Sequence, residues 1–85
     1  MQRIIEVKDG GLQSMLGKKI TLFCMIYIYT GKLIGVSEDH VELESPLLVY
    51  ETGELAVGCW EDAQKLPGVH RVMRAAIESW GPAKC

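Results

Sequence analysis

The sequence predicts a single domain of the mainly β class. The clearest observation is the stretch from Tyr27 to Ser45, where strand patterns alternate with short glycine-containing or acidic turns. A length of 85 residues allows only one domain. Hydrophobic residues make up 48% of the chain, which is more than a domain of this size can bury. The composition therefore favours contact with another copy of the chain.

A short helix is expected before the main strands. Residues 3–8 have a weak strand character and lead into a glycine-containing turn. Leu12, Met15 and Leu16 then fall at helical spacing, and Gly17 ends the pattern. This spacing predicts one or two helical turns lying across one mouth of the following structure.

The first long strand is expected over residues 20–29. Both of its alternating faces are apolar, so both need to be covered. Thr30-Gly31 is interpreted as the turn of a tight hairpin, because glycine adopts the positive φ that such turns need. The return strand, 32–36, contains Gly35, which is interpreted as the corner of a barrel.

Residues 40–44 alternate cleanly, which predicts a third strand with Val41 and Leu43 facing inward. Pro46 is expected to end it, because proline donates no amide hydrogen to a ladder. For 47–50 two options remain open, a helical turn or an extension of the strand. A polar helical turn is expected over 61–65.

The segment 69–80 returns to strand character, with a break at Arg74-Ala75 and a close at Gly81-Pro82. The predicted domain, 1–85, thus has a helix and three strands over 12–45. A variable loop insertion follows over 46–68, and strands four and five over 69–80.

Several of these features resemble the Sm and Sm-like (LSm) proteins, the family that includes the bacterial RNA chaperone Hfq. The likeness covers residues 12–80. It rests on the short helix and on three motifs, which are Leu16-Gly17-Lys18-Lys19-Ile20-Thr21, Gly31-x-x-x-Gly35 and Val72-Met73-Arg74-Ala75-Ala76-Ile77. The resemblance implies a small, strongly bent, five-stranded SH3-like barrel with a short N-terminal helix. It also implies homo-oligomeric rings in which the fourth strand of one subunit pairs with the fifth of the next.

In that family, single-stranded RNA rich in uridine or adenine is bound near the pore by two turns. The resemblance places Asp39 and His40 in the first turn and Arg74 in the second. The first turn keeps the acidic residue but lacks the family's aromatic residue and Asn, unless His40 substitutes by stacking on a base. The second turn keeps the cation but has Ala75 where the family has Gly or His.

These residues also have simpler interpretations. Arg74 can bind a phosphate or stack on a base, or it can form an ion pair with a glutamate such as Glu42, Glu44 or Glu78. Asp39 can stabilise its own turn, and His40 can be a solvated strand residue. The chain is therefore interpreted as a ring-forming Sm-like binding module for single-stranded RNA. The alternative is a structural or adaptor ring that binds another protein through 47–68, which the acidic balance and the incomplete pore motifs favour.

Other function classes find less support. The net charge of −2 gives no global attraction to nucleic acid, so RNA binding would need a local basic site. Cys24, Cys59 and Cys85 form no C-x-x-C motif and are interpreted as free thiols in a reducing compartment, without a metal or cofactor. No catalytic trio or phosphate-binding loop stands out, so no enzymatic activity is expected. The start is not signal-like and no apolar run spans a bilayer, which predicts a cytoplasmic protein without membrane contact.

Overall fold

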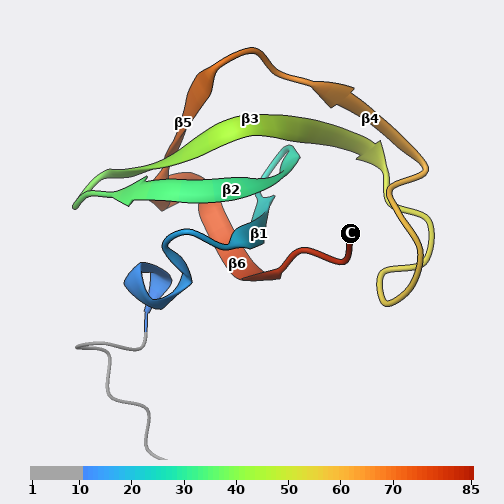
Figure 1. The fold of residues 1–85 in the computed structure, drawn as a ribbon, viewed down its shortest axis with the longest axis horizontal. Coiled ribbons are helices and arrows are strands. Elements are labelled where there is room, and N and C mark those ends of the chain that lie inside the picture. The colour runs from blue at the N-terminus through green and yellow to red at the C-terminus, as the bar shows by residue number, and fades with distance from the viewer. Residues whose placement is uncertain (1–10) are drawn as a thin grey trace, which may run out of the picture.

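A computed structural model describes residues 11–85 and confirms the mainly β class (Figure 1). Within these residues the chain forms one antiparallel sheet of six strands, rather than five, with two short 3₁₀ helices. The elements in chain order are η1 (Leu12–Met15), β1 (Lys19–Cys24), β2 (Ile28–Val36), β3 (His40–Glu51), β4 (Asp62–Lys65), β5 (Val69–Met73), η2 (Arg74–Ala76) and β6 (Ile77–Pro82). The strand order is β4-β3-β2-β1-β6, and β5 pairs with β3 beside β4. The sheet is open, because β5 and β6 do not pair within the described residues.

The hairpin between β1 and β2 turns at residues 25–27, so the turn predicted at Thr30-Gly31 is wrong. Thr30 and Gly31 lie inside β2, opposite Thr21 and Ile20 of β1. Gly31 has no positive φ; a Cβ atom built on it would lie 2.9 Å from Pro46 Cα. Glycine is therefore required here because β3 passes close to β2, and not because the chain reverses direction.

Strand β3 continues through Pro46 to Glu51, so the prediction that Pro46 ends the strand is wrong. The ladder between β2 and β3 shifts register here, and Ser45 takes a positive φ of 45°. Because a bulge interrupts regular pairing, the missing amide hydrogen of proline is tolerated there. The Pro46 side chain is fully buried.

The second half of β3 pairs with β4. This pairing confirms the strand option for 47–50 and shows that the helical turn predicted over 61–65 is wrong. The predicted variable insertion is thus partly sheet, and its irregular part is the segment 52–61 between the two strands. Pairing with β3 imposes extended structure on a polar sequence with little preference of its own.

The ends of the described region fit the predictions in part. The expected helix is a single 3₁₀ turn, η1, and Gly17 follows it with a φ of +84°. The Gly17 amide donates to the Leu33 carbonyl at 2.8 Å, which fixes this segment to β2. The break expected at Arg74-Ala75 is η2, and the strand expected over 3–8 lies outside the described residues.

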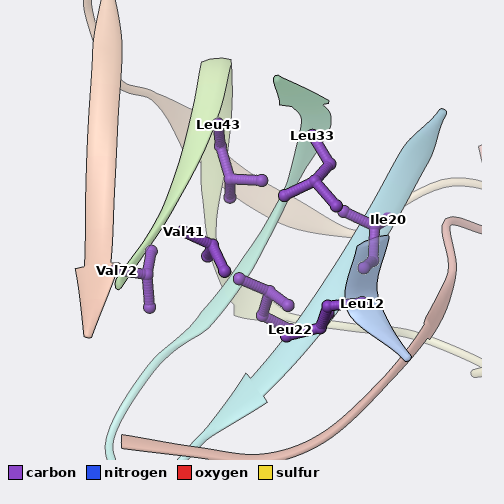
Figure 2. Packing of buried hydrophobic residues seen from close by; sticks show 7 residues of the cluster. All are labelled: Leu12, Ile20, Leu22, Leu33, Val41, Leu43 and Val72. Carbon is purple, nitrogen blue, oxygen red and sulfur yellow. The ribbon is translucent and has the colours of Figure 1, made fainter. Parts of the chain in front are cut away.

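The core lies on one face of the curved sheet and is closed by η1. Val41 and Leu43 of β3 are fully buried, as their alternation predicted. Figure 2 shows the side chains of the core cluster converging from η1, β1, β2, β3 and β5. Its members are Leu12, Ile20, Leu22, Leu33, Val41, Leu43 and Val72. No helix within residues 11–85 has the length and apolar character needed to cross a membrane.

The cysteine prediction is wrong for two of the three residues. Cys59 and Cys85 form a disulfide, with Cα atoms 5.3 Å apart, and only Cys24 is free. The pairing escaped prediction because 26 positions separate the two residues, and the fold brings the segment after β6 against the loop between β3 and β4. The cysteines therefore give no support to the predicted reducing compartment.

Candidate functional site

The three predicted site residues lie together where two turns of the chain meet. Asp39 lies in the turn between β2 and β3, His40 begins β3, and Arg74 begins η2 directly after β5. The Arg74 amide donates to the Asp39 carbonyl at 2.8 Å, and Arg74 Nη1 donates to the Ser37 carbonyl at 2.9 Å. The antiparallel ladder between β3 and β5 pairs His40 with Met73, which sets this meeting point.

The first turn is held by a compact set of side-chain contacts. His40 Nδ1 lies 2.9 Å from Ser37 Oγ and 2.9 Å from Asp39 Oδ1, and Ser37 Oγ donates to Asp39 Oδ1 at 3.0 Å. The His40 amide also donates to Ser37 Oγ at 3.2 Å. Hydrogen bonds from His40 first, and then from Ser37, hold the pKa of the Asp39 carboxyl below its usual range. Asp39 thus stabilises its turn through side chains, while its carboxylate remains exposed.

Arg74 has a different environment from its neighbour Arg71. Arg71 Nε forms an ion pair with Glu42 Oε2 at 3.0 Å across the β3–β5 ladder. Within residues 11–85 no carboxylate oxygen lies within 4.0 Å of the Arg74 guanidinium, so the ion pair considered for it is not present there. Arg74 is half-buried and its guanidinium donates to a backbone carbonyl, so it has no ion-pair partner within residues 11–85 and most of its donors remain unused.

The polar cluster does not form a nucleophilic relay. A serine nucleophile needs one nitrogen of the imidazole while an acid orients the other. Ser37 and Asp39 both contact Nδ1 of His40, and Glu42 Oε2 is 4.0 Å from Nε2. The part of the chain that the structure describes also contains no group of three His, Cys, Asp or Glu residues placed to hold a metal ion. The arrangement leaves most donors of the Arg74 guanidinium and the exposed Asp39 carboxylate accessible to a ligand.

An apolar groove that the sequence did not predict lies beside this cluster. It has a volume of about 370 Å³ and runs between the β1–β2 hairpin tip and the strand β5. Met25, Tyr27, Tyr29 and Met73 contribute to its lining, and Met25 is 74% exposed. The apolar run Met25-Ile26-Tyr27 could have indicated this groove. The strand pattern over 20–29 includes the run, however, and so gives no sign that it lies at a hairpin tip.

Two ionisable groups line the inner part of this groove. Burial, and then the charge of Glu78, raise the pKa of the Cys24 thiol. Burial also raises the pKa of the Tyr29 hydroxyl, and the Tyr29 ring stacks on His70 at a centroid distance of 5.4 Å. Arg71 is the charged residue among those that line the groove.

Strands β4, β5 and β6 each leave one edge without a partner strand among the described residues. Backbone bonds join Arg74 to Asp39 and Ser45 to Gly68 at the two ends of the β3–β5 ladder. Because bonded and non-bonded pairs alternate in an antiparallel ladder, the amides of 69, 71 and 73 point away from β3. By the same alternation, the backbone N–H and C=O groups of Trp80 in β6 point away from β1.

Comparison with known protein families, with characterised proteins and with solved structures finds no match for the chain.

Proposed function

We propose that the chain is an Sm-like binding module that forms a homo-oligomeric ring and binds single-stranded RNA near its centre. The observation that carries the proposal is the contact between the two turns bearing Asp39, His40 and Arg74. The resemblance expects these two turns to act on one ligand, although 34 positions separate Arg74 from His40 in the sequence. A closed ring would repeat this site once in every subunit.

The free edges support the assembly part of the proposal. The resemblance implies that the last two strands of the bent barrel pair between subunits. Here β5 and β6 each have an unpaired edge, as does β4. Exposed edges with outward amides favour pairing with another chain. A β5 edge that meets a β6 edge is a heterologous contact, and such contacts give rings when the rotation closes.

The charge around Arg74 defines the RNA expected. Glu38 and the exposed Asp39 carboxylate belong to the turn that Arg74 contacts, so a run of phosphates along this turn would be repelled. A guanidinium can instead stack on a base or bond a single phosphate in bidentate fashion. We therefore expect short, unpaired oligonucleotides, bound with a modest dependence on salt.

The RNA part is tested by fluorescence anisotropy with oligo-uridine and oligo-adenine at about 50 mM salt, where phosphate contacts are strong. Arg74→Ala should weaken binding by at least about tenfold, which corresponds to the loss of one good contact. Arg71→Ala is the matched control, because this arginine is exposed and already paired with Glu42. A wild-type protein that fails to bind at this salt, or equal losses in both variants, would contradict the proposed site.

Assembly is tested separately by light scattering on a sizing column. Arg71→Pro removes an amide that points away from β3, so it should reduce the oligomer to smaller species while preserving the β3–β5 ladder. Arg71→Ala controls for loss of the side chain. A wild-type protein that elutes as a monomer at micromolar concentration would refute the ring.

A second candidate is an adaptor ring whose ligand is another protein. Exposed large apolar side chains favour it, because such side chains are typical of protein contacts. The insertion expected to serve such a partner also exposes Leu55 and Val57. An assembled protein that binds neither oligonucleotide would support this candidate.

A further inference from the structure

The segment 83–85 is fastened to the irregular loop 52–60 by three different contacts. Figure 1 shows the end of the chain approaching this loop, which follows β3. Lys84 Nζ donates to the Thr52 carbonyl at 2.6 Å, to the Glu54 carbonyl and to the Val57 carbonyl at 3.5 Å. Its ammonium also lies 4.7 Å from the centroid of the Trp60 ring. The third contact is the Cys59–Cys85 disulfide.

These contacts depend on one another. Three carbonyls converge on one ammonium only while the loop is curled, and Gly53 and Gly58 provide the curl with φ values of +66° and +74°. Lys84 is the immediate neighbour of Cys85, so the disulfide holds the ammonium within reach of the carbonyls. If Cys85 is released, both attachments weaken together.

The closed loop also contains one unfavourable feature, a buried polar group of Trp60. Trp60 Nε1 is buried without a hydrogen-bond partner among the described residues. A buried unpaired N–H is unfavourable, and the indole regains a water partner when the loop opens. The disulfide and the hydrogen bonds of Lys84 therefore hold the loop closed, whereas the unpaired Trp60 indole favours opening.

We propose that Cys59 and Cys85 form a thiol-sensitive latch that controls whether loop 52–60 is held against segment 83–85. The reductant is a low-molecular-weight thiol such as glutathione. Its thiolate attacks one sulfur of the disulfide, forms a mixed disulfide and releases the other cysteine, which takes up a proton. A second small thiolate then attacks the sulfur of the first small thiol in this mixed disulfide and releases the remaining protein cysteine, which also takes up a proton. The two protein cysteines gain two electrons and two protons, and the small thiols leave as one disulfide.

The positions of the sulfurs suit this exchange. Cys59 and Cys85 are both exposed residues, so a small thiol can approach them. Cys24 is half-buried in the apolar groove on another part of the sheet and does not compete for the bond. Cys85 also lines a hollow of about 270 Å³ together with Lys19 and Lys32, so its release removes part of one wall of this hollow. The latch does not depend on the proposed ring or on RNA binding.

The test is hydrogen–deuterium exchange of the full chain after oxidation with glutathione disulfide and after reduction with dithiothreitol. Peptide mapping should find Cys59 linked to Cys85 in the oxidised protein. Amides in 52–60 should exchange at least about tenfold faster after reduction or in Cys85→Ser, while amides of β1, β2 and β3 keep their rates. Cys24→Ser is the matched control and should respond to reduction as the wild type does.

Two further variants separate the parts of the latch. In the oxidised protein, Lys84→Met should accelerate exchange in 52–60 although the disulfide is intact. In a Trp80→Phe background, the remaining Trp60 should become more accessible to acrylamide quenching on reduction. Equal exchange in the oxidised and reduced proteins, or no linkage between Cys59 and Cys85, would overturn the proposal. Unchanged exchange in Lys84→Met would overturn the role of the ammonium.

Discussion

Replacement of Gly31 by alanine tests the close passage of β2 against β3. The new Cβ atom would lie 2.9 Å from Pro46 Cα and 3.0 Å from Pro46 Cβ. Both atoms belong to a rigid, fully buried residue, so the strands themselves must separate. The matched control is Gly35→Ala, because its Cβ would lie 2.8 Å from Glu42 Oε1, at the far end of a flexible side chain.

The two substitutions should differ clearly in free energy of unfolding. Overpacking in a well-packed interior destabilises by about 1–3 kcal/mol, which is the range expected for Gly31→Ala. At Gly35 the glutamate can swing aside, and the weakened Glu42–Arg71 pair is worth at most about 1 kcal/mol at the surface. Alanine also recovers about 0.4–1 kcal/mol by restricting the unfolded chain. Gly35→Ala should therefore lie within about 1 kcal/mol of the wild type.

Thermal and urea unfolding monitored by circular dichroism measure this difference. For a domain of this size each kcal/mol corresponds to about 4–8 °C in Tm. Gly31→Asn separates the two interpretations of this glycine, since asparagine is tolerated in turns with positive φ but adds more bulk against Pro46. A Gly31→Asn variant more stable than Gly31→Ala, or a Gly31→Ala variant as stable as the wild type, would refute the close passage.

Three further predictions follow from buried and titrating groups. Leu43→Ala removes a fully buried side chain and should destabilise the protein by about 2–5 kcal/mol in urea unfolding, against less than about 1.5 kcal/mol for Leu43→Met. Asp39 has a depressed pKa in the folded state, so its contribution to stability is present above its unfolded pKa and is lost as pH falls through the folded value. The Tm of wild type should thus exceed that of Asp39→Asn near pH 6, and the two should converge in strong acid. In the reduced protein Cys24 should react with iodoacetamide at pH 8 more slowly than Cys59 and Cys85, because its thiol pKa is raised, and urea should remove the difference.

The alternation of apolar and polar residues along the chain predicted those features of the fold that depend on neighbouring residues alone. The inward positions Val41 and Leu43 followed from a period of two, because one face of that strand is solvated and the other is core. The break at Arg74 followed from the loss of strand character around Ala75. The meeting of Asp39, His40 and Arg74 came from the resemblance, since nothing in their spacing alone places them together.

Contacts between distant segments decided the features that the sequence did not predict. A run of ten strand-forming residues contains no breaker at Met25-Ile26-Tyr27, so the hairpin tip has no local signal. Glycine at 31 has two uses, turn and close approach, and only the position of Pro46 decides between them. The Cys59–Cys85 pair likewise depends on how β6 ends, which no spacing rule encodes.

The surplus of apolar residues and the open edge of β5 are features of one surface. Met73 belongs to both, because its side chain lines the groove and its amide points away from β3. A strand added to the free edge of β5 would therefore be placed beside Met25 and Ile26, which are 74% and 83% exposed. Trp80, 37% exposed on the free edge of β6, supplies a large apolar side chain on the strand that the proposed assembly brings there. One contact between copies would satisfy the unpaired amides and cover the groove, so the adaptor candidate requires apolar surface that the ring leaves uncovered, such as Leu55 and Val57.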